Sequence, residues 1–250
     1  MRRKLMKEIG NLAQRSIKWR FKNPVTIIMT MIQPLMWLLL FANLFNANDP
    51  NFMSFILAGI LVMAILFSSG MSGIANYSLK ESGSYYRVMI SPISRKSIII
   101  AHIVDAVVLS GIQIVVLLLI SFMFGTRIQS GLLGLFSIII LLLVMVAFVS
   151  TISYLLSSAI PDENGFIAII NTFTLPLFFL STALVQKESL SKLFQVLVSI
   201  NPFTYVINSL RNLITESAID WQLYGLSILV MLILAILCIG ITSKKIETVE

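Results

Sequence analysis

The sequence has very little of the chemistry on which most enzymes depend. Of its 250 residues, one is cysteine, one is histidine and 11 are Asp or Glu. The single cysteine, Cys238, excludes an intrachain disulfide. The single histidine, His102, excludes the zinc-protease motif, which needs two histidines on one helix. Because no group of Cys, His or carboxylate side chains has metal-ligand spacing, we expect neither a metal site nor a catalytic residue.

Two common nucleotide and acyl-transfer motifs are also missing. The chain has no G-x-x-x-x-G-K-[ST] loop with which to cradle phosphates, and no G-x-S-x-G nucleophile elbow. We therefore expect no cofactor in this chain. We therefore expect the energy that drives its function to come from another protein.

Charge is scarce as well. Only 12% of the residues are charged and 58% are hydrophobic, whereas soluble domains have about 25% charged residues. Apolar runs of about 18 residues or more are typical of membrane-spanning helices. The composition therefore predicts an all-α integral membrane protein.

Six apolar runs are long enough to cross a bilayer as helices. We predict spans at about 25–46, 53–75, 98–124, 131–159, 164–185 and 221–242. A helix of about 22 residues rises about 33 Å, which covers a hydrocarbon core. The first run is longer than the core of a cleaved signal peptide and follows a basic leader, so we interpret it as a retained span. One membrane domain, residues 1–250, then covers the chain.

The distribution of basic residues predicts the orientation. The net charge of +7 could indicate nucleic-acid binding, but the basic clusters flank apolar runs, as in membrane proteins. With six alternating spans, most Lys and Arg side chains fall on one side of the membrane: Arg2, Arg3, Lys4, Lys7, Arg15, Lys18, Arg20, Lys22, Lys80, Arg87, Arg95, Lys96, Lys244 and Lys245. The other side holds only Arg127, Lys187, Lys192 and Arg211. We therefore expect both termini in the cytoplasm and no nucleic-acid partner.

The leader, residues 1–24, has two helical faces. Its polar face carries Lys4, Lys7, Asn11, Arg15, Lys18 and Lys22, and its apolar face carries Leu5, Ile9, Leu12 and Trp19. Spacings of three and four residues put each set on one side of a helix. This pattern predicts an amphipathic helix on the inner membrane surface. The alternative is a frayed basic tail that serves only orientation.

Residues 186–220 form the longest segment on the outer side. The run LFQVLVSI (193–200) is too short to span, and Asn201-Pro202 separates it from FTYVINSLRNLI (203–214). Proline disfavours helix at the residue before it. We predict two short helices that break at Asn201 and Pro202 and lie in the outer interface or dip into the membrane as a re-entrant pair. The alternative is an ordinary amphipathic surface loop.

Polar residues inside the spans are the candidates for an intramembrane role. His102, Asp105 and Gln113 fall on one face of the third span. Three interpretations stay open: a structural His–Asp pair, the lining of a cavity, subunit interface or transport path, and a proton relay. In the second span, Ser69 and Gly73 form a small-xxx-small pair that allows close helix approach.

The inner end of the fourth span is rich in hydroxyl groups. It carries Ser150, Thr151, Ser153, Ser157 and Ser158. Serine and threonine inside a helix commonly bond the carbonyl of the preceding turn. We expect these side chains to bond their own helix.

The loop between the second and third spans, ESGSYYRVMISPISRKS (81–97), is compact and mostly basic. Residues 84–91 are long enough for about two helical turns, which Pro92 would end. Aromatic and arginine side chains typically dominate small protein interfaces. A short cytoplasmic helix with this composition is suited to docking a partner protein.

The whole arrangement resembles the membrane subunits of type-2 ABC exporters. The resemblance rests on KNPVTIIMTMIQPLMWLLLF, FILAGILVMAILFSSGMSGI, the 81–97 loop, LPLFFLSTALV and INPFTYVINSLRNLI, in that order. Within the family the chain is most similar to the subgroup that exports daunorubicin-like drugs and other antibiotics. Thr182 departs from the family pattern, in which glycine follows the serine of the fifth span.

The resemblance implies partners and a coupling site. Such subunits dimerise, and each binds a separate cytoplasmic ATPase subunit that holds ATP and Mg. The coupling helix would consist of Ser84, Tyr85, Tyr86, Arg87, Val88, Met89, Ile90, Ser91 and Pro92. The leader would be the interfacial helix, and residues 193–214 the outer re-entrant pair.

These expectations lead to a main functional hypothesis and several alternatives. We expect a non-enzymatic permease subunit, as a homodimer in the plasma membrane, that exports a drug, antibiotic or peptide. The nearly uncharged spans favour such a cargo over a charged glycolipid. Export of lipid-linked polysaccharide or lipid is the second hypothesis. Two hypotheses belong to other classes of protein. One is a proton-coupled transporter that uses Asp105 and His102, and the other is a non-transporting scaffold.

Overall fold

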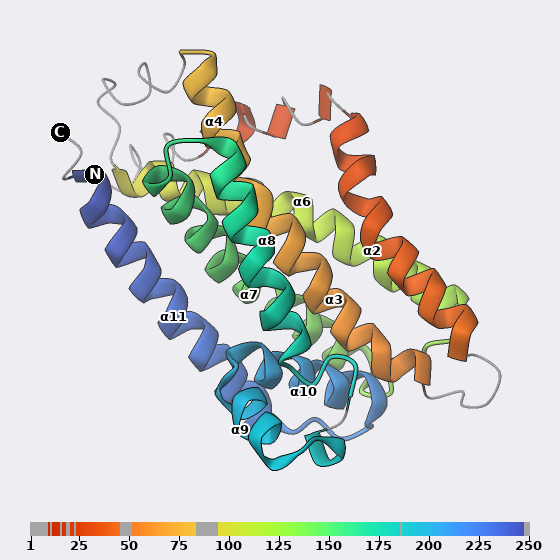
Figure 1. The fold of residues 1–250 in the computed structure, drawn as a ribbon. Helices are drawn as coiled ribbons and strands as arrows, with labels where there is room; N and C mark the ends of the chain where they lie inside the picture. Colours follow the sequence, from red (N-terminus) through yellow and green to blue (C-terminus); the bar gives the residue numbers. More distant parts are fainter. Residues whose placement is uncertain are drawn as a thin grey trace.

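Long helices run side by side through the protein, and two short helices lie across one of its ends (Figure 1). The computed structural model describes residues 10–247 except 11, 16, 19, 20, 23, 46–51, 84–94 and 186. Within these residues the regular elements are all helical, which confirms the all-α prediction. The predicted leader helix falls mostly outside the described residues and stays a prediction.

The elements follow one another along the chain without a strand in the described part. They are α2 (Pro24–Phe45), α3 (Phe52–Gly70), the 3-10 turn η1 (Met71–Gly73), α4 (Ile74–Glu81), α6 (Arg95–Met123), α7 (Gly131–Ala159), α8 (Glu163–Phe179), the 3-10 turn η2 (Lys187–Ser189), α9 (Lys192–Ile200), α10 (Pro202–Thr215) and α11 (Trp221–Glu247).

Four stretches of the described residues are long and apolar enough to cross a membrane, or five if the bent pair α9–α10 forms one span. The four are Met53–Glu81, Ser97–Met123, Gly131–Ala159 and Trp221–Lys244, and they coincide with the second, third, fourth and sixth predicted spans. The first predicted span has its counterpart in α2, which has 22 residues, and the fifth has a shorter counterpart in α8, which has 17 residues. The described residues thus contain four or five candidate membrane spans, and the total of six stays a prediction.

Two helix ends differ from the predicted span boundaries. The second span was expected to end near residue 75, but η1 and α4 continue it to Glu81. The fifth was expected to reach residue 185, but α8 ends at Phe179. The side-chain amide of Asn201 donates to the carbonyl oxygens of Leu177 and Leu180, at 2.6 and 2.7 Å. These bonds satisfy carbonyls that the end of a helix leaves free, so the chain can leave the helix there.

The core of the bundle is built around α3 and α7. α3 packs against α2, α6, α7, α8 and α10, and its Leu57, Leu61 and Ile65 are almost completely buried. The peripheral helices instead expose large apolar side chains, such as Met36 on α2 and Ile236 on α11. Such exposure is what lipid-facing helices require.

The two ends of the bundle carry different elements. The end of α4, the start of α6 and the end of α11 lie at one end, and α9 and α10 lie at the other (Figure 1). The helix ends that flank the predicted docking loop and the bent helix pair therefore lie at opposite ends of the bundle. This arrangement agrees with the predicted assignment of the two loops to opposite sides of the membrane, which itself stays a prediction.

Candidate functional site

The predicted coupling residues, Ser84 to Pro92, lie outside the described residues, but the structure describes how the chain enters this loop. α4 ends at Glu81, and the N–H of Ser82 donates to the carbonyl oxygen of Ser78 at 3.1 Å. Gly83 has φ +65, a left-handed conformation that glycine adopts without a steric penalty. The chain therefore turns off the α4 axis at Gly83, directly before the predicted coupling residues.

A buried serine of α7 joins that helix to the turn that precedes α4. The N–H of Gly73 donates to Ser153 Oγ at 2.8 Å, and Ser153 Oγ donates to the carbonyl oxygen of Gly70 at 2.5 Å. A 3-10 turn within a longer helix shifts the regular hydrogen-bond register. One hydroxyl of α7 thus bonds the last residue of α3, directly before η1, and the last residue of η1.

A second contact lies one turn further along both helices. Asn76 Nδ2 donates to Ser157 Oγ at 2.6 Å, and Lys80 Nζ donates to the Ser157 carbonyl oxygen at 3.3 Å. The hydroxyl of Tyr77 donates to the carbonyl oxygen of Ile160 at 3.0 Å. These contacts and those of Ser153 form what we call the inner joint: Gly70, Gly73, Asn76, Tyr77 and Lys80 on one side, and Ser153, Ser157 and Ile160 on the other.

The inner joint corrects one expectation from the sequence. Ser150, Thr151 and Ser158 do bond carbonyls of their own helix, at 3.3, 2.7 and 2.7 Å. Ser153 instead bonds the Gly70–Gly73 turn, and Ser157 bonds Asn76 in addition to its own helix. The contact of Ser153 with this turn could have been inferred from the Ser69–Gly73 pair, since small residues let two helix backbones approach closely.

The predicted polar stripe of α6 is divided between different neighbours. His102 Nε2 lies 3.1 Å from Ser72 Oγ, and its ring centroid is 5.0 Å from that of Tyr154 on α7. Gln113 is buried and donates from Nε2 to the carbonyl oxygen of Thr30 on α2 at 2.7 Å. Asp105 is also buried. His102 thus contacts η1 and Gln113 contacts α2, so the two ends of the stripe pack against different elements.

At the opposite end of the bundle, α9 and α10 meet at Asn201 with a bend of 88°. Asn201 Oδ1 accepts from the N–H of Phe203 at 3.0 Å, which caps α10, while Pro202 occupies the first turn. The amide of the same side chain bonds the end of α8. The helices break at the residues where the sequence predicts a break, and their depth in a membrane stays a prediction.

Arg211 ties this bent pair to two other elements. Its guanidinium lies 3.6 Å from the ring centroid of Phe55 on α3, and Nη2 donates to the Thr182 carbonyl oxygen at 2.7 Å. The Thr182 hydroxyl donates to Asn208 Oδ1 at 2.7 Å. Thr182, the departure from the family pattern, therefore contributes a bond that glycine could not make.

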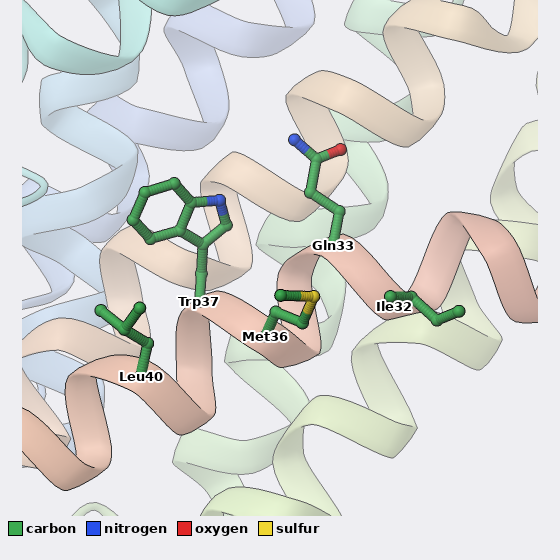
Figure 2. Close-up of a pocket in the computed structure, with 5 residues that line it drawn as sticks. All are labelled: Ile32, Gln33, Met36, Trp37 and Leu40. Atoms are coloured by element: carbon green, nitrogen blue, oxygen red, sulfur yellow. The ribbon is translucent and has the colours of Figure 1, made fainter.

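An open groove runs along the surface of α2 (Figure 2). It has a volume of about 320 Å³ and is lined by Ile32, Gln33, Met36, Trp37 and Leu40. Gln33 and Trp37 extend from the same side of the helix, so the lining pairs an amide and an indole with aliphatic and thioether groups. All five lining residues belong to α2, so the groove is an open surface feature of this one helix.

These features define a class of protein: a helical membrane protein with the inner joint beside the 81–97 loop at one end of the bundle, and a bent helix pair at the opposite end. The model of the ABC-2 type transporter family matches residues 7–215. The chain belongs to this family, as its sequence motifs predict. It is therefore the membrane subunit of an ABC transporter, and membership implies association with an ABC ATPase.

Curated relatives agree with this assignment. A protein named as the transport permease ycf38 of Porphyra purpurea is 31% identical over 227 residues, which cover 87% of this chain and 77% of the relative. The corresponding protein of Cyanophora paradoxa is 31% identical over 205 residues, 79% of this chain and 70% of the relative. The daunorubicin resistance ABC transporter permease protein DrrB1 of Streptomyces coeruleorubidus is 23% identical over 216 residues, which cover 82% of this chain and 75% of the relative.

Proposed function

We propose that this chain is the permease subunit of an ATP-driven exporter that moves an amphipathic drug, antibiotic or peptide out across the plasma membrane. The observation that carries the proposal is the family match over residues 7–215, which includes both the 81–97 loop and the bent helix pair. The chain itself performs no hydrolysis. A separate ATPase subunit binds ATP and Mg and supplies the energy.

The proposed docking element for the ATPase is the coupling helix Ser84–Pro92. Its two flanks, the end of α4 and the start of α6, lie at the same end of the bundle (Figure 1), so a protein that binds the loop can displace both helices at once. Tyr86 and Arg87 are the residue types that dominate small interfaces. We further propose that two copies of the chain assemble, each with its own ATPase subunit.

The proposed cargo class is supported by the groove on α2. Its lining residues carry no charge, which suits a lipophilic molecule better than an acidic headgroup. The printed name of the Streptomyces relative connects that protein with resistance to daunorubicin. Lipid-linked polysaccharide or lipid is the second candidate cargo, and competition between the two classes for ATP-driven export decides between them.

The docking proposal is tested by co-purification of the tagged chain with its ABC ATPase from detergent. We expect the Arg87→Glu, Tyr86→Ala double variant to lose the ATPase while the membrane domain stays folded. The matched control is Arg127→Glu, an equal charge reversal in the exposed loop between α6 and α7, which should retain the ATPase. Native-like recovery of the ATPase with the double variant would refute the docking site.

A further inference from the structure

We propose that the inner joint is the transmission element of the transporter, with Ser153 and Asn76 as its positioning residues. In this proposal α4 and the inner end of α7 move as one body when the ATPase pulls on the coupling loop, and the bundle bends at η1. The proposal rests on the proposed function and adds the path by which loop movement reaches the membrane helices.

The first argument is that η1 is a break held by a neighbouring helix. α3, η1 and α4 form one continuous stretch, Met53–Glu81, and 3-10 segments inside long helices often mark hinges. Ser153 accepts from the N–H of Gly73, the last residue of η1, and donates to the carbonyl oxygen of Gly70, the residue before η1. The hydroxyl of α7 therefore bonds backbone groups at both ends of the 3-10 turn and ties the turn to α7.

The second argument is that α4 is bonded to α7 along its length. Asn76, Tyr77 and Lys80 each donate to an acceptor of the α7 end, at Ser157 or Ile160. Asn76 and Ser157 are buried, Ser157 completely. Hydrogen bonds in a water-poor interior are costly to leave unmade, so α4 and the end of α7 resist separation.

The third argument is that backbone contact at the joint is close. A Cβ atom on Gly73 would lie 2.7 Å from the Ser153 carbonyl oxygen and 2.9 Å from Phe166 Cζ. Because the two backbones are in close contact here, η1 cannot shift toward α7 unless α7 shifts with it. Gly83, only two residues beyond α4, then leads directly into the predicted coupling residues.

The proposal is tested with the native transporter complex in proteoliposomes, by measuring cargo moved per ATP hydrolysed. For Ser153→Ala and for Asn76→Leu, we expect ATPase recovery and ATP hydrolysis to be retained. The coupling ratio should fall about tenfold, which corresponds to the loss of one buried hydrogen-bonded pair. The matched control is Ser150→Ala, which removes an equally buried hydroxyl of α7 that bonds its own helix. An unchanged coupling ratio in Ser153→Ala would overturn the proposal.

A distance measurement keeps the proposal testable even if these variants fold poorly. Cys238 is the single cysteine, so in a Cys238→Ser background spin labels can be placed at the exposed residues Ser78 of α4 and Ala159 of α7. We expect the separation of these labels to stay constant when ATP binds to the complex. A changed separation during a cycle that transports cargo would show that α4 moves relative to α7, and would refute the joint.

Failure of this inference differs visibly from failure of the proposed function. If the native complex shows no ATP-dependent transport and binds no ABC ATPase, the proposed function is wrong and the joint has nothing to transmit. If the native complex transports cargo and Ser153→Ala does so with the same coupling ratio, only the transmission element is wrong.

Discussion

The substitution Gly73→Ala tests the packing of η1 against α7 most sharply. A Cβ atom at this position would lie 2.7 Å from the carbonyl oxygen of Ser153, 2.8 Å from its Oγ and 2.9 Å from Phe166 Cζ. Separations below 3.0 Å are shorter than van der Waals contact. The nearest atom belongs to the backbone of α7, so a side-chain rotation cannot relieve the clash, and the two helices have to move apart.

The magnitude follows from three contributions. Adding a methyl group to a packed interior costs about 1–3 kcal/mol. Moving the helices apart also weakens the bonds of Ser153 to Gly73 and Gly70, at about 1 kcal/mol each. Alanine regains about 1 kcal/mol over glycine inside a helix. The net loss of stability is therefore about 2–4 kcal/mol.

The assay is thermal unfolding of the purified chain in detergent. For a chain of this size, a loss of about 2–4 kcal/mol lowers the unfolding midpoint by about 5–15 °C. The matched control is Gly111→Ala, because a Cβ atom at Gly111 of α6 meets nothing within 4 Å. We expect the control to keep or slightly raise the midpoint. Equal midpoints for the two variants would refute the close approach of η1 and α7.

Three further substitutions probe the outer end and the groove. Asn201→Ala removes the cap of α10 and two hydrogen bonds to the end of α8. We expect a loss of about 2–4 kcal/mol in the free energy of unfolding and a lower unfolding midpoint, and a native midpoint would contradict this. Thr182→Gly removes the bond to Asn208 and should destabilise by about 1 kcal/mol in the same assay, whereas a stabilised variant would contradict it. Gln33→Leu should raise the cargo concentration for half-maximal transport about fivefold by removing a hydrogen-bonding group from the groove; an unchanged value excludes the groove as a cargo contact.

Local patterns predicted several elements of the fold well. The predicted span 131–159 coincides with α7, because Gly131 with φ +69 and Pro161 bound a continuous apolar run. The break between α9 and α10 falls at Asn201 and Pro202, since proline excludes helix before it and asparagine caps the helix after it. Such elements depend on residues that are neighbours in sequence.

The contacts of the inner joint could not be predicted from local sequence patterns. Ser153 and Gly73 are 80 positions apart, and nothing near Ser153 in sequence distinguishes it from Ser150, which bonds its own helix. Only the packing of α7 against η1 decides which hydroxyl finds a neighbouring backbone. The pairing of Gln113 with the Thr30 carbonyl oxygen is likewise a result of tertiary packing, although the sequence did place Gln113 on a polar face inside the third span.

The predicted coupling residues, Ser84 to Pro92, remain a prediction from residue types and family resemblance. The structure contributes their setting: α4 is bonded to α7 through Asn76 and Lys80, and it ends at a glycine turn. A loop anchored in this way can transmit a displacement only if something binds it. The co-purification and coupling-ratio measurements address these two requirements separately.

The most direct test of the central proposal is export by the chain and its ABC ATPase reconstituted together in proteoliposomes. We predict cargo movement that requires ATP hydrolysis and continues when an ionophore collapses the proton gradient. Movement that stops with the ionophore while ATP remains, and that proceeds without the ATPase, would contradict the proposal and favour a proton-coupled transporter.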